Sequence, residues 1–279
     1  MRLDAARAWL TEALAGGESP RADADALLCH LLERDRGYLL SWPERELTPD
    51  QLARLEGWLA RRQHGEPVAH ILGEREFWSL SLLVSPATLI PRPDTEVLVE
   101  QALMRLPATP ARVLDLGTGT GAIALALKSE RPDDEVWAVD AQPDAVALAR
   151  RNCERLRLPL LLRLGSWFEP LGDAPRFDLI VSNPPYIDGT DPHLAQGDVR
   201  FEPLTALVAD EEGLADLRHI VFGARAHLAF GGWLLLEHGW QQGASVRRLL
   251  AEAGYDAIET VRDYGDNDRV TLGRFQGTT

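Results

Sequence analysis

The 279-residue sequence predicts an α/β fold, in which a doubly wound, mostly parallel seven-stranded sheet follows a small N-terminal all-helical domain. Three observations predict this fold. Before residue 70, apolar side chains recur at helical spacing. From residue 111, short apolar runs alternate with segments of helical periodicity, as in parallel sheets covered by helices on both faces. The first apolar run ends in a glycine-rich turn, which is typical of doubly wound sheets.

Residues 1–70 are expected to form the helical bundle. Thr48 followed by Pro49 has the cap-then-proline order with which helices begin, and leucines at helical spacing come after it. Residues 71–90 change to a partial period-two alternation, which indicates a strand. We therefore expect a linker with a short strand or hairpin over residues 71–90 and a second domain over residues 91–279.

The second domain is expected to begin with a turn and a helix. Asp94 or Thr95 can cap a helix that contains Val97 and Leu98. Arg92 lies between two prolines, and its role is left open. The expected strands span residues 111–116, 135–140, 160–164, 177–182, 233–237, 257–261 and 269–275. The expected helices between them span residues 122–130, 143–156, 214–229 and 243–253.

A glycine loop, Gly117-Thr118-Gly119-Thr120-Gly121, follows the first of these strands. Such a turn lets backbone N–H groups approach a ligand closely at a helix N-terminus. Asp140 ends the next strand about 20 residues on, where a carboxylate can accept hydrogen bonds from ribose hydroxyls. Trp167, after the third strand, either packs in the core or offers an aromatic surface for an adenine. The pattern fits a nicotinamide dinucleotide and also S-adenosylmethionine, whose amino acid end needs hydrogen bonds.

The motif Asn183-Pro184-Pro185-Tyr186 follows the fourth strand. Neither proline can donate to a sheet ladder, and a residue before a proline is restricted to extended dihedrals, so this loop is stiff. The amide oxygen of Asn183 and the carbonyl oxygen of Pro184 are two acceptors that suit an NH2 group. Tyr186 adds a flat aromatic wall. No histidine or lysine stands in the motif to act as a base, which favours catalysis by orientation of the nucleophile.

Composition limits the function classes. The formal net charge is −14, and most of the acidic excess lies after residue 70, which is weak evidence against a nucleic-acid substrate. The two cysteines are too few for a disulfide framework or a cysteine-rich metal site, so no metal is expected. No segment approaches the ~20 apolar residues of a membrane span, and the N-terminus does not read as a signal peptide. We therefore expect a cytoplasmic monomer.

Three segments, Leu89 to Glu96, Asp115 to Gly121 and Ser182 to Tyr186, together resemble the protein-(glutamine-N5) methyltransferases of the HemK/PrmC family, which modify class-one peptide chain release factors. The resemblance extends over nearly the whole chain. Its further segments are Phe77 to Leu80, Glu237 to Trp240, Asp263 to Asn267 and Arg269 to Gly273.

The resemblance implies a class I, Rossmann-like methyltransferase domain and S-adenosyl-L-methionine as the cofactor. By the same resemblance, residues Gly117 to Gly121 would bind this cofactor, Asp140 would hold its ribose and Trp167 would contact its adenine. Residues Asn183 to Tyr186 would receive the glutamine of the release factor's Gly-Gly-Gln loop, with Asn183 lining both cofactor and substrate. The helical domain would help to recognise the partner, and the reaction would support translation termination.

Three other functions compete with this one. A methyltransferase of exocyclic amines in nucleic acids would hold its NH2 group with the same pair of acceptors. A nicotinamide-dependent dehydrogenase would need a general acid such as histidine or lysine, which the Asn-Pro-Pro-Tyr motif does not supply. A non-catalytic S-adenosylmethionine-binding module would have no need of the two acceptors. The role of Glu237, at the end of the fifth strand, is left open.

Overall fold

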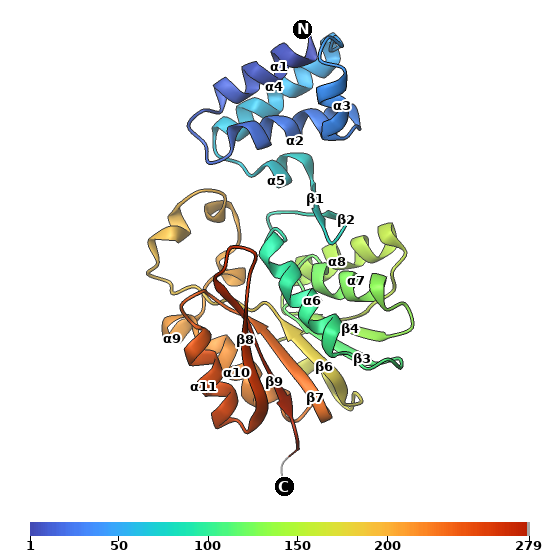
Figure 1. The fold of residues 1–279 in the computed structure, drawn as a ribbon, viewed down its shortest axis with the longest axis vertical. Coiled ribbons are helices and arrows are strands. Elements are labelled where there is room, and N and C mark those ends of the chain that lie inside the picture. The colour runs from blue at the N-terminus through green and yellow to red at the C-terminus, as the bar shows by residue number, and fades with distance from the viewer. Residues whose placement is uncertain (278–279) are drawn as a thin grey trace. The chain divides into compact units, whose positions relative to one another are not determined.

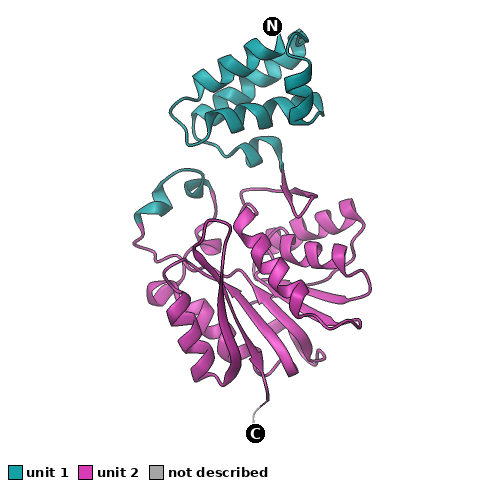
Figure 2. Ribbon diagram, in the orientation of Figure 1, with its two compact units in different colours: residues 1–74, 192–201 teal, residues 75–191, 202–279 magenta. Residues whose placement is uncertain are grey.

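The computed structural model describes residues 1–277 of the chain, which divides into two compact units (Figure 2). Unit 1 comprises residues 1–74 and 192–201. Unit 2 comprises residues 75–191 and the chain from residue 202 onward. Residues 192–201 lie within the range expected for the second domain, yet they cluster with the helical unit.

Unit 1 is a bundle of helices that bury leucines against one another. Its helices are α1 (Leu3–Ala13), α2 (Pro20–Leu32), α3 (Arg36–Ser41), α4 (Pro49–Gln63) and α5 (Val68–Leu72), and residues 192–201 add the short turns η3 (Pro192–Ala195) and η4 (Val199–Phe201). Helix α4 begins with a capping box, in which the Thr48 hydroxyl accepts from the Gln51 amide and the Gln51 side chain accepts from the Thr48 amide. Leu10, Leu28 and Leu55 are fully buried in this bundle.

A hairpin follows the bundle, with β1 (Glu74–Phe77) paired to β2 (Leu80–Leu83). The two residues between the strands, Trp78 and Ser79, have φ angles of 51° and 58°. Positive φ at both central positions is the backbone of the tight turns that join two twisted strands.

Unit 2 contains a seven-stranded sheet in the order β5-β4-β3-β6-β7-β9-β8 among the described residues (Figure 1). The strands are β3 (Arg112–Leu116), β4 (Glu135–Asp140), β5 (Leu161–Leu164), β6 (Phe177–Ser182), β7 (Leu228–Glu237), β8 (Tyr255–Arg262) and β9 (Asp268–Phe275). Strands β3 to β7 pair in parallel, whereas β9 is antiparallel to both β7 and β8. The predicted doubly wound, mostly parallel sheet is therefore confirmed.

Helices cover both faces of this sheet (Figure 1). They are α6 (Glu96–Arg105), α7 (Ala122–Glu130), α8 (Pro143–Leu156), α9 (Asp210–Gly213), α10 (Ala215–Ala224) and α11 (Gly243–Glu252), with the short turns η1 (Pro93–Thr95), η2 (Glu169–Leu171) and η5 (Leu204–Ala206). Successive residues of a strand point to opposite faces. Val113 accordingly packs in the apolar cluster of α6 and α7, and its neighbour Leu114 packs in the cluster of α10 and α11.

The helix expected over residues 214–229 is shorter than predicted. Helix α10 ends at Ala224, and β7 begins at Leu228, where it pairs with Phe177. Apolar residues on both sides of this boundary fit either a buried helix or a buried strand, so periodicity alone does not place it. The register of β7 against β6 shifts after Leu228 and resumes at Trp233, so the extra strand length includes a bulge.

The sheet brings the predicted motifs to one edge. Strands β3, β4, β6 and β7 run parallel, so their C-terminal ends lie together. Strand order reverses at β3, which has β4 on one side and β6 on the other. Open α/β sheets bind ligands at such a reversal, outside the C-terminal ends of the strands.

Candidate active site

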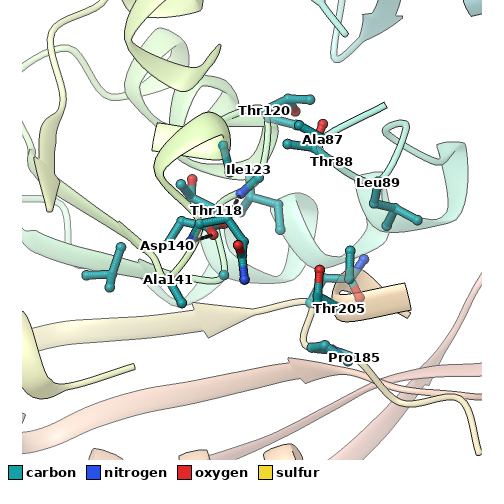
Figure 3. A pocket seen from close by; sticks show the side chains of 18 of the residues that line it. Ala87, Thr88, Leu89, Thr118, Thr120, Ile123, Asp140, Ala141, Pro185 and Thr205 are labelled. Carbon is teal, nitrogen blue, oxygen red and sulfur yellow. Dashed lines mark hydrogen bonds between the residues drawn. The ribbon is translucent and has the colours of Figure 1, made fainter. Parts of the chain in front are cut away.

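A cavity of about 1060 Å³, its open mouth included, lies at this edge of the sheet in unit 2 (Figure 3). Predicted site residues form much of its wall. They are Gly117, Thr118, Gly119, Thr120, Asp140, Trp167, Asn183 and Pro185. The remaining predicted residues, Gly121, Pro184 and Tyr186, are not among those that line the cavity.

The glycine loop is fastened to the neighbouring strand by its own backbone. The amides of Gly117 and Thr118 both donate to the Val139 carbonyl, and the amide of Gly119 donates to Asp140 at 2.8 Å. These three N–H groups already donate to β4 and its last residue. They therefore do not point toward a ligand, which differs from the expectation from the sequence. The loop contributes a close, side-chain-poor wall to the cavity.

Gly121 ends the loop in a conformation and a packing that require glycine. Its φ angle is +84°, a left-handed conformation that side chains rarely adopt. A Cβ at this position would also lie 3.2 Å from Leu125 and 3.4 Å from Ala149. The glycine is therefore needed for the turn into α7 and for close packing.

Asp140 sits at the end of β4 with its carboxylate in the cavity wall. One oxygen accepts from Gly119, and the other accepts from the amide of Gln142 at 2.9 Å. Burial raises the pKa of Asp140, although the backbone N–H donors oppose that rise. Each carboxylate oxygen has a second lone pair, so the group can still accept hydrogen bonds from two hydroxyls of a ligand.

A second acid, Asp115, lies under the loop at the end of β3. Asp115 is fully buried, and the Thr118 hydroxyl donates to it at 2.6 Å. Burial raises the pKa of Asp115 to about 7. Its Oδ1 makes no hydrogen bond of ordinary geometry with any described residue.

The Asn183–Tyr186 loop leaves β6 beside the cavity. Asn183 Nδ2 donates to the Thr95 hydroxyl at 3.3 Å. No described residue donates a hydrogen bond to Asn183 Oδ1 or to the Pro184 carbonyl. The loop thus retains the two acceptors that the sequence predicts.

Tyr186 is not among the residues that line the cavity, although the sequence suggested an aromatic wall of the site. Its hydroxyl donates to Glu237 Oε1 at 3.4 Å, and its backbone carbonyl accepts from the Gln242 side chain at 3.0 Å. Burial is the main reason that the pKa of Tyr186 is raised well above its usual value, and the Glu237 charge adds to the rise. Tyr186 therefore anchors the loop to β7.

Arg92, whose role the sequence leaves open, lies in the cavity wall. Its guanidinium bonds to Glu202 at 2.6 Å, and the other oxygen of Glu202 accepts from the Ile90 amide at 2.9 Å. The Glu202 side chain is completely buried, whereas the Arg92 side chain is 33% exposed. Among the described residues that line the cavity, Arg92 is the one cation, beside the acids Asp140 and Asp216.

Several residues of this site escape prediction from the sequence. Thr88, Thr205 and Ala206 line the cavity from segments without a motif. Thr95 is predicted as a possible helix cap, but its side chain makes no cap hydrogen bond. Glu237 ends a strand of apolar residues and is 2% exposed. The sequence analysis leaves its role open, and an acid at the end of an apolar strand is the local signal that points to it.

The cavity fits S-adenosylmethionine, the cofactor that the resemblance implies. A carboxylate for ribose hydroxyls, an indole ring and a cation all face one space, at Asp140, Trp167 and Arg92. The glycine loop adds backbone at its glycines and the side chains of Thr118 and Thr120 to the wall of that space. This donor and acceptor set suits a nucleoside with an amino acid end.

Comparisons with known proteins agree with this geometry. The PrmC N-terminal domain family matches residues 5–73, and the methyltransferase small domain family matches residues 93–199. The release factor glutamine methyltransferase of Escherichia coli is 60% identical over 271 residues, which cover 96% of this chain and 98% of that protein. The one of Vibrio cholerae is 56% identical over 277 residues, which cover 98% and 97%.

A solved structure supports the fold. A methyltransferase from Pyrococcus furiosus matches 80% of this chain and 100% of its own, with a TM-score of 0.56 and 20% sequence identity. At this identity the likeness concerns the arrangement of the strands and helices.

Proposed function

This chain belongs to the family of release factor glutamine methyltransferases, and we propose that it methylates the side-chain amide nitrogen of a glutamine in class-one peptide chain release factors. S-Adenosyl-L-methionine is the methyl donor. The observation that carries the proposal is the pair of free acceptors, Asn183 Oδ1 and the Pro184 carbonyl, beside the cavity that fits this cofactor.

Residues of the cavity would hold the cofactor. Asp140 would accept hydrogen bonds from the ribose hydroxyls, and the Trp167 ring would pack against the adenine. Arg92, the one cation among the described lining residues, would attract the carboxylate of the amino acid end. When bound, this cofactor supplies a methyl group on a positively charged sulfur. The glycine loop keeps the wall close to the ligand because it carries few side chains.

The acceptor pair would orient the substrate. A carboxamide nitrogen is a weak nucleophile because its lone pair is delocalised into the carbonyl. Acceptors on both N–H bonds hold this nitrogen in line for attack and favour its rehybridisation. Such positioning contributes roughly 7–11 kcal/mol in favourable cases. The same acceptors stabilise the positive charge that develops on nitrogen.

Proton removal needs no dedicated base in this mechanism. No histidine or lysine is among the described residues that line the cavity. The amide nitrogen is too weakly acidic to lose a proton before reaction. After the methyl group has been transferred, the nitrogen is strongly acidic, and its proton passes to water or to a nearby carbonyl.

Unit 1 would contribute to partner recognition. Leu40 and Trp42 expose 59% and 54% of their surface on this unit, which suits contact with a protein. Within residues 1–277 no helix is long and apolar enough to cross a membrane. We propose a cytoplasmic monomer that acts on a protein and does not bind nucleic acid directly.

A methyl-transfer assay tests the proposed function. The protein would be incubated with methyl-labelled cofactor and one of four acceptors: a release factor, the same factor with the loop glutamine changed to alanine, duplex DNA or total RNA. We expect label on the unchanged release factor alone. Label on nucleic acid, or equal label on the altered factor, would contradict the proposal.

A further inference from the structure

Thr95 occupies a helix-cap position, but its side chain bonds to Asn183 and not to the helix. It is the N-cap residue of α6 and is 4% exposed, and its hydroxyl makes no hydrogen bond to the helix backbone. Instead, the hydroxyl accepts from Asn183 Nδ2 at 3.3 Å. A threonine at an N-cap usually satisfies a backbone donor of the first turn. Here that stabilisation is given up for a contact with Asn183, 88 residues away in the sequence.

Glu237 lies behind Thr95. It ends β7, is 2% exposed and accepts from the Tyr186 hydroxyl at 3.4 Å. The Thr95 hydroxyl lies near the Glu237 carboxylate and lowers its pKa, and Glu237 Oε2 has no hydrogen-bond partner of ordinary geometry among the described residues. The carboxylate thus lies near Thr95, at the end of η1, and accepts from Tyr186, in the Asn183–Tyr186 loop.

The direction of these hydrogen bonds decides how the Asn183 amide is turned. An ionised carboxylate only accepts, and a hydroxyl has a single proton. When Thr95 gives that proton to Glu237, its lone pairs remain for the Asn183 NH2 group. Asn183 Oδ1 is then left as the acceptor next to the cavity. The opposite amide orientation would place two donors against a substrate NH2 group, which is itself a donor.

We propose that Thr95 and Glu237 are positioning residues that hold the Asn183 amide with its oxygen toward the substrate. This inference rests on the proposed function for its effect on catalysis. The orientation itself is a property of the protein without ligands. Thr95, which also lines the cavity, and Glu237 act through Asn183.

The charges around Glu237 predict a pH dependence. Burial raises the pKa of Glu237 to about 7, whereas Arg269 lowers it and Asp94 raises it. Tyr186 and the adjacent His238 are the other titratable groups nearby, and burial lowers the pKa of His238. Below its pKa, Glu237 is protonated and no longer requires the Thr95 proton. We therefore expect kcat to fall as the pH drops through about 7, and Glu237→Gln to lack this step.

Substitutions at Thr95 test the inference by kinetics. Thr95→Val removes the hydroxyl at nearly constant volume, and Thr95→Ser keeps it. Loss of one such hydrogen bond predicts a fall in kcat of about 10–30-fold for the valine variant. The serine variant should stay within about threefold of the parent. Cofactor Kd, measured by calorimetry, should change little in either.

A matched control and a double variant distinguish positioning of Asn183 from a general effect of losing a buried hydroxyl. Thr271 is also fully buried and hydrogen-bonded, to His238 and not to Asn183, so Thr271→Val should keep the parent kcat. In an Asn183→Ala background, Thr95→Val should cause no further loss of kcat. An equal, additive loss in that background would overturn the inference, as would a serine variant as slow as the valine variant.

Side-chain NMR tests the orientation without any substrate. The Asn183 NH2 signal, assigned by its absence in Asn183→Ala, should exchange slowly with solvent in the parent and about tenfold faster in Thr95→Val. Equal exchange rates in the two proteins would overturn the inference. This readout stays decisive if the methyl-transfer assay reveals a different acceptor, so failure of the proposed function and failure of the inference are distinguishable.

Discussion

The glycine loop and the Asn183–Tyr186 loop leave neighbouring strands at the same sheet edge, but they are built in different ways. The glycine loop takes its shape from its own backbone, with left-handed φ angles at Gly117, Gly119 and Gly121. The other loop has a stiff backbone, but the side chain of its acceptor residue, Asn183, is held by Thr95, far away in the sequence. The first loop owes its turn to its own glycines, with its amides bonded to β4, whereas the side chain of the second loop is held by a residue from another element.

This difference has a consequence for catalysis. A wall that binds a cofactor needs a stable shape, which a short local sequence can encode. An acceptor that must face a reacting nitrogen needs a fixed orientation, and one loop cannot supply it alone. Substitutions in the first loop should therefore change binding or stability, and those in the second should change turnover.

The largest effect is expected from Asn183→Ala. The variant loses the acceptor that orients the substrate, so kcat should fall about 10²–10³-fold, as when one donor of an oxyanion hole is removed. The Kd for S-adenosylmethionine should stay within about threefold, because Asp140 and the glycine loop remain. Stopped-flow turnover and calorimetry would measure the two quantities. A variant that kept most of its turnover would show that the loop does not act by orientation.

Glu237→Gln should change the pH dependence of stability. The folded-state pKa of Glu237 is raised to about 7, so the buried charge destabilises the fold above that pH and costs nothing below about pH 4.5, where the group is protonated in both states. The glutamine variant should be more stable than the parent at pH 8, by at most roughly 3 kcal/mol. The difference should shrink as the pH falls to 5.

Thermal unfolding across this pH range would measure the Glu237 effect. Asp115→Asn is the matched comparison, because burial also raises the pKa of Asp115 to about 7. It should show the same trend in stability. A Glu237→Gln variant whose stability gain is the same at pH 5 and pH 8 would argue against a buried carboxylate.

Asp140→Ala should act on cofactor binding. The variant loses the acceptor for the ribose hydroxyls and also the bond that fastens the Gly119 amide. Hydrogen bonds to charged groups are worth about 1.5–3 kcal/mol, so the Kd should rise about 10–150-fold. At saturating cofactor kcat should recover most of its value. An unchanged Kd would remove Asp140 from the cofactor site.

Gly121→Ala should give the smallest effect, and on stability more than on turnover. The left-handed φ angle of +84° costs an alanine about 1–2 kcal/mol, and contact with Leu125 adds to this. Gly57→Ala is the control, because Gly57 lies within α4 and a Cβ there meets nothing within 4 Å. That control should raise Tm slightly, whereas Gly121→Ala lowers it.

The same contrast explains how much could be predicted from the sequence. The sheet and its strands follow from periodicity, because a short apolar run by itself indicates a buried strand. The glycine loop and Asp140 follow from a local motif, and the cavity brings them together as expected. What the local pattern could not show is the direction of the loop amides, since their acceptor belongs to the neighbouring strand β4.

The support of the second loop could not be predicted for a physical reason. Thr95 has a sequence context that indicates a helix cap, and only the packing of α6 beside β6 and β7 shows that its hydroxyl meets Asn183. Tyr186 is expected to form a flat aromatic wall, but its hydroxyl donates to the buried Glu237 instead. Each contact joins residues that are at least 51 positions apart, so no local spacing reveals it.

The most direct test of the account is the site of methylation and its dependence on Asn183. A release factor would be incubated with cofactor and either the parent protein or Asn183→Ala, and its peptides would be fragmented in a mass spectrometer. We expect the added methyl group on the side-chain amide nitrogen of a single glutamine with the parent, and almost none with the variant under the same conditions. A methyl group on another residue, or equal modification by both proteins, would contradict the account.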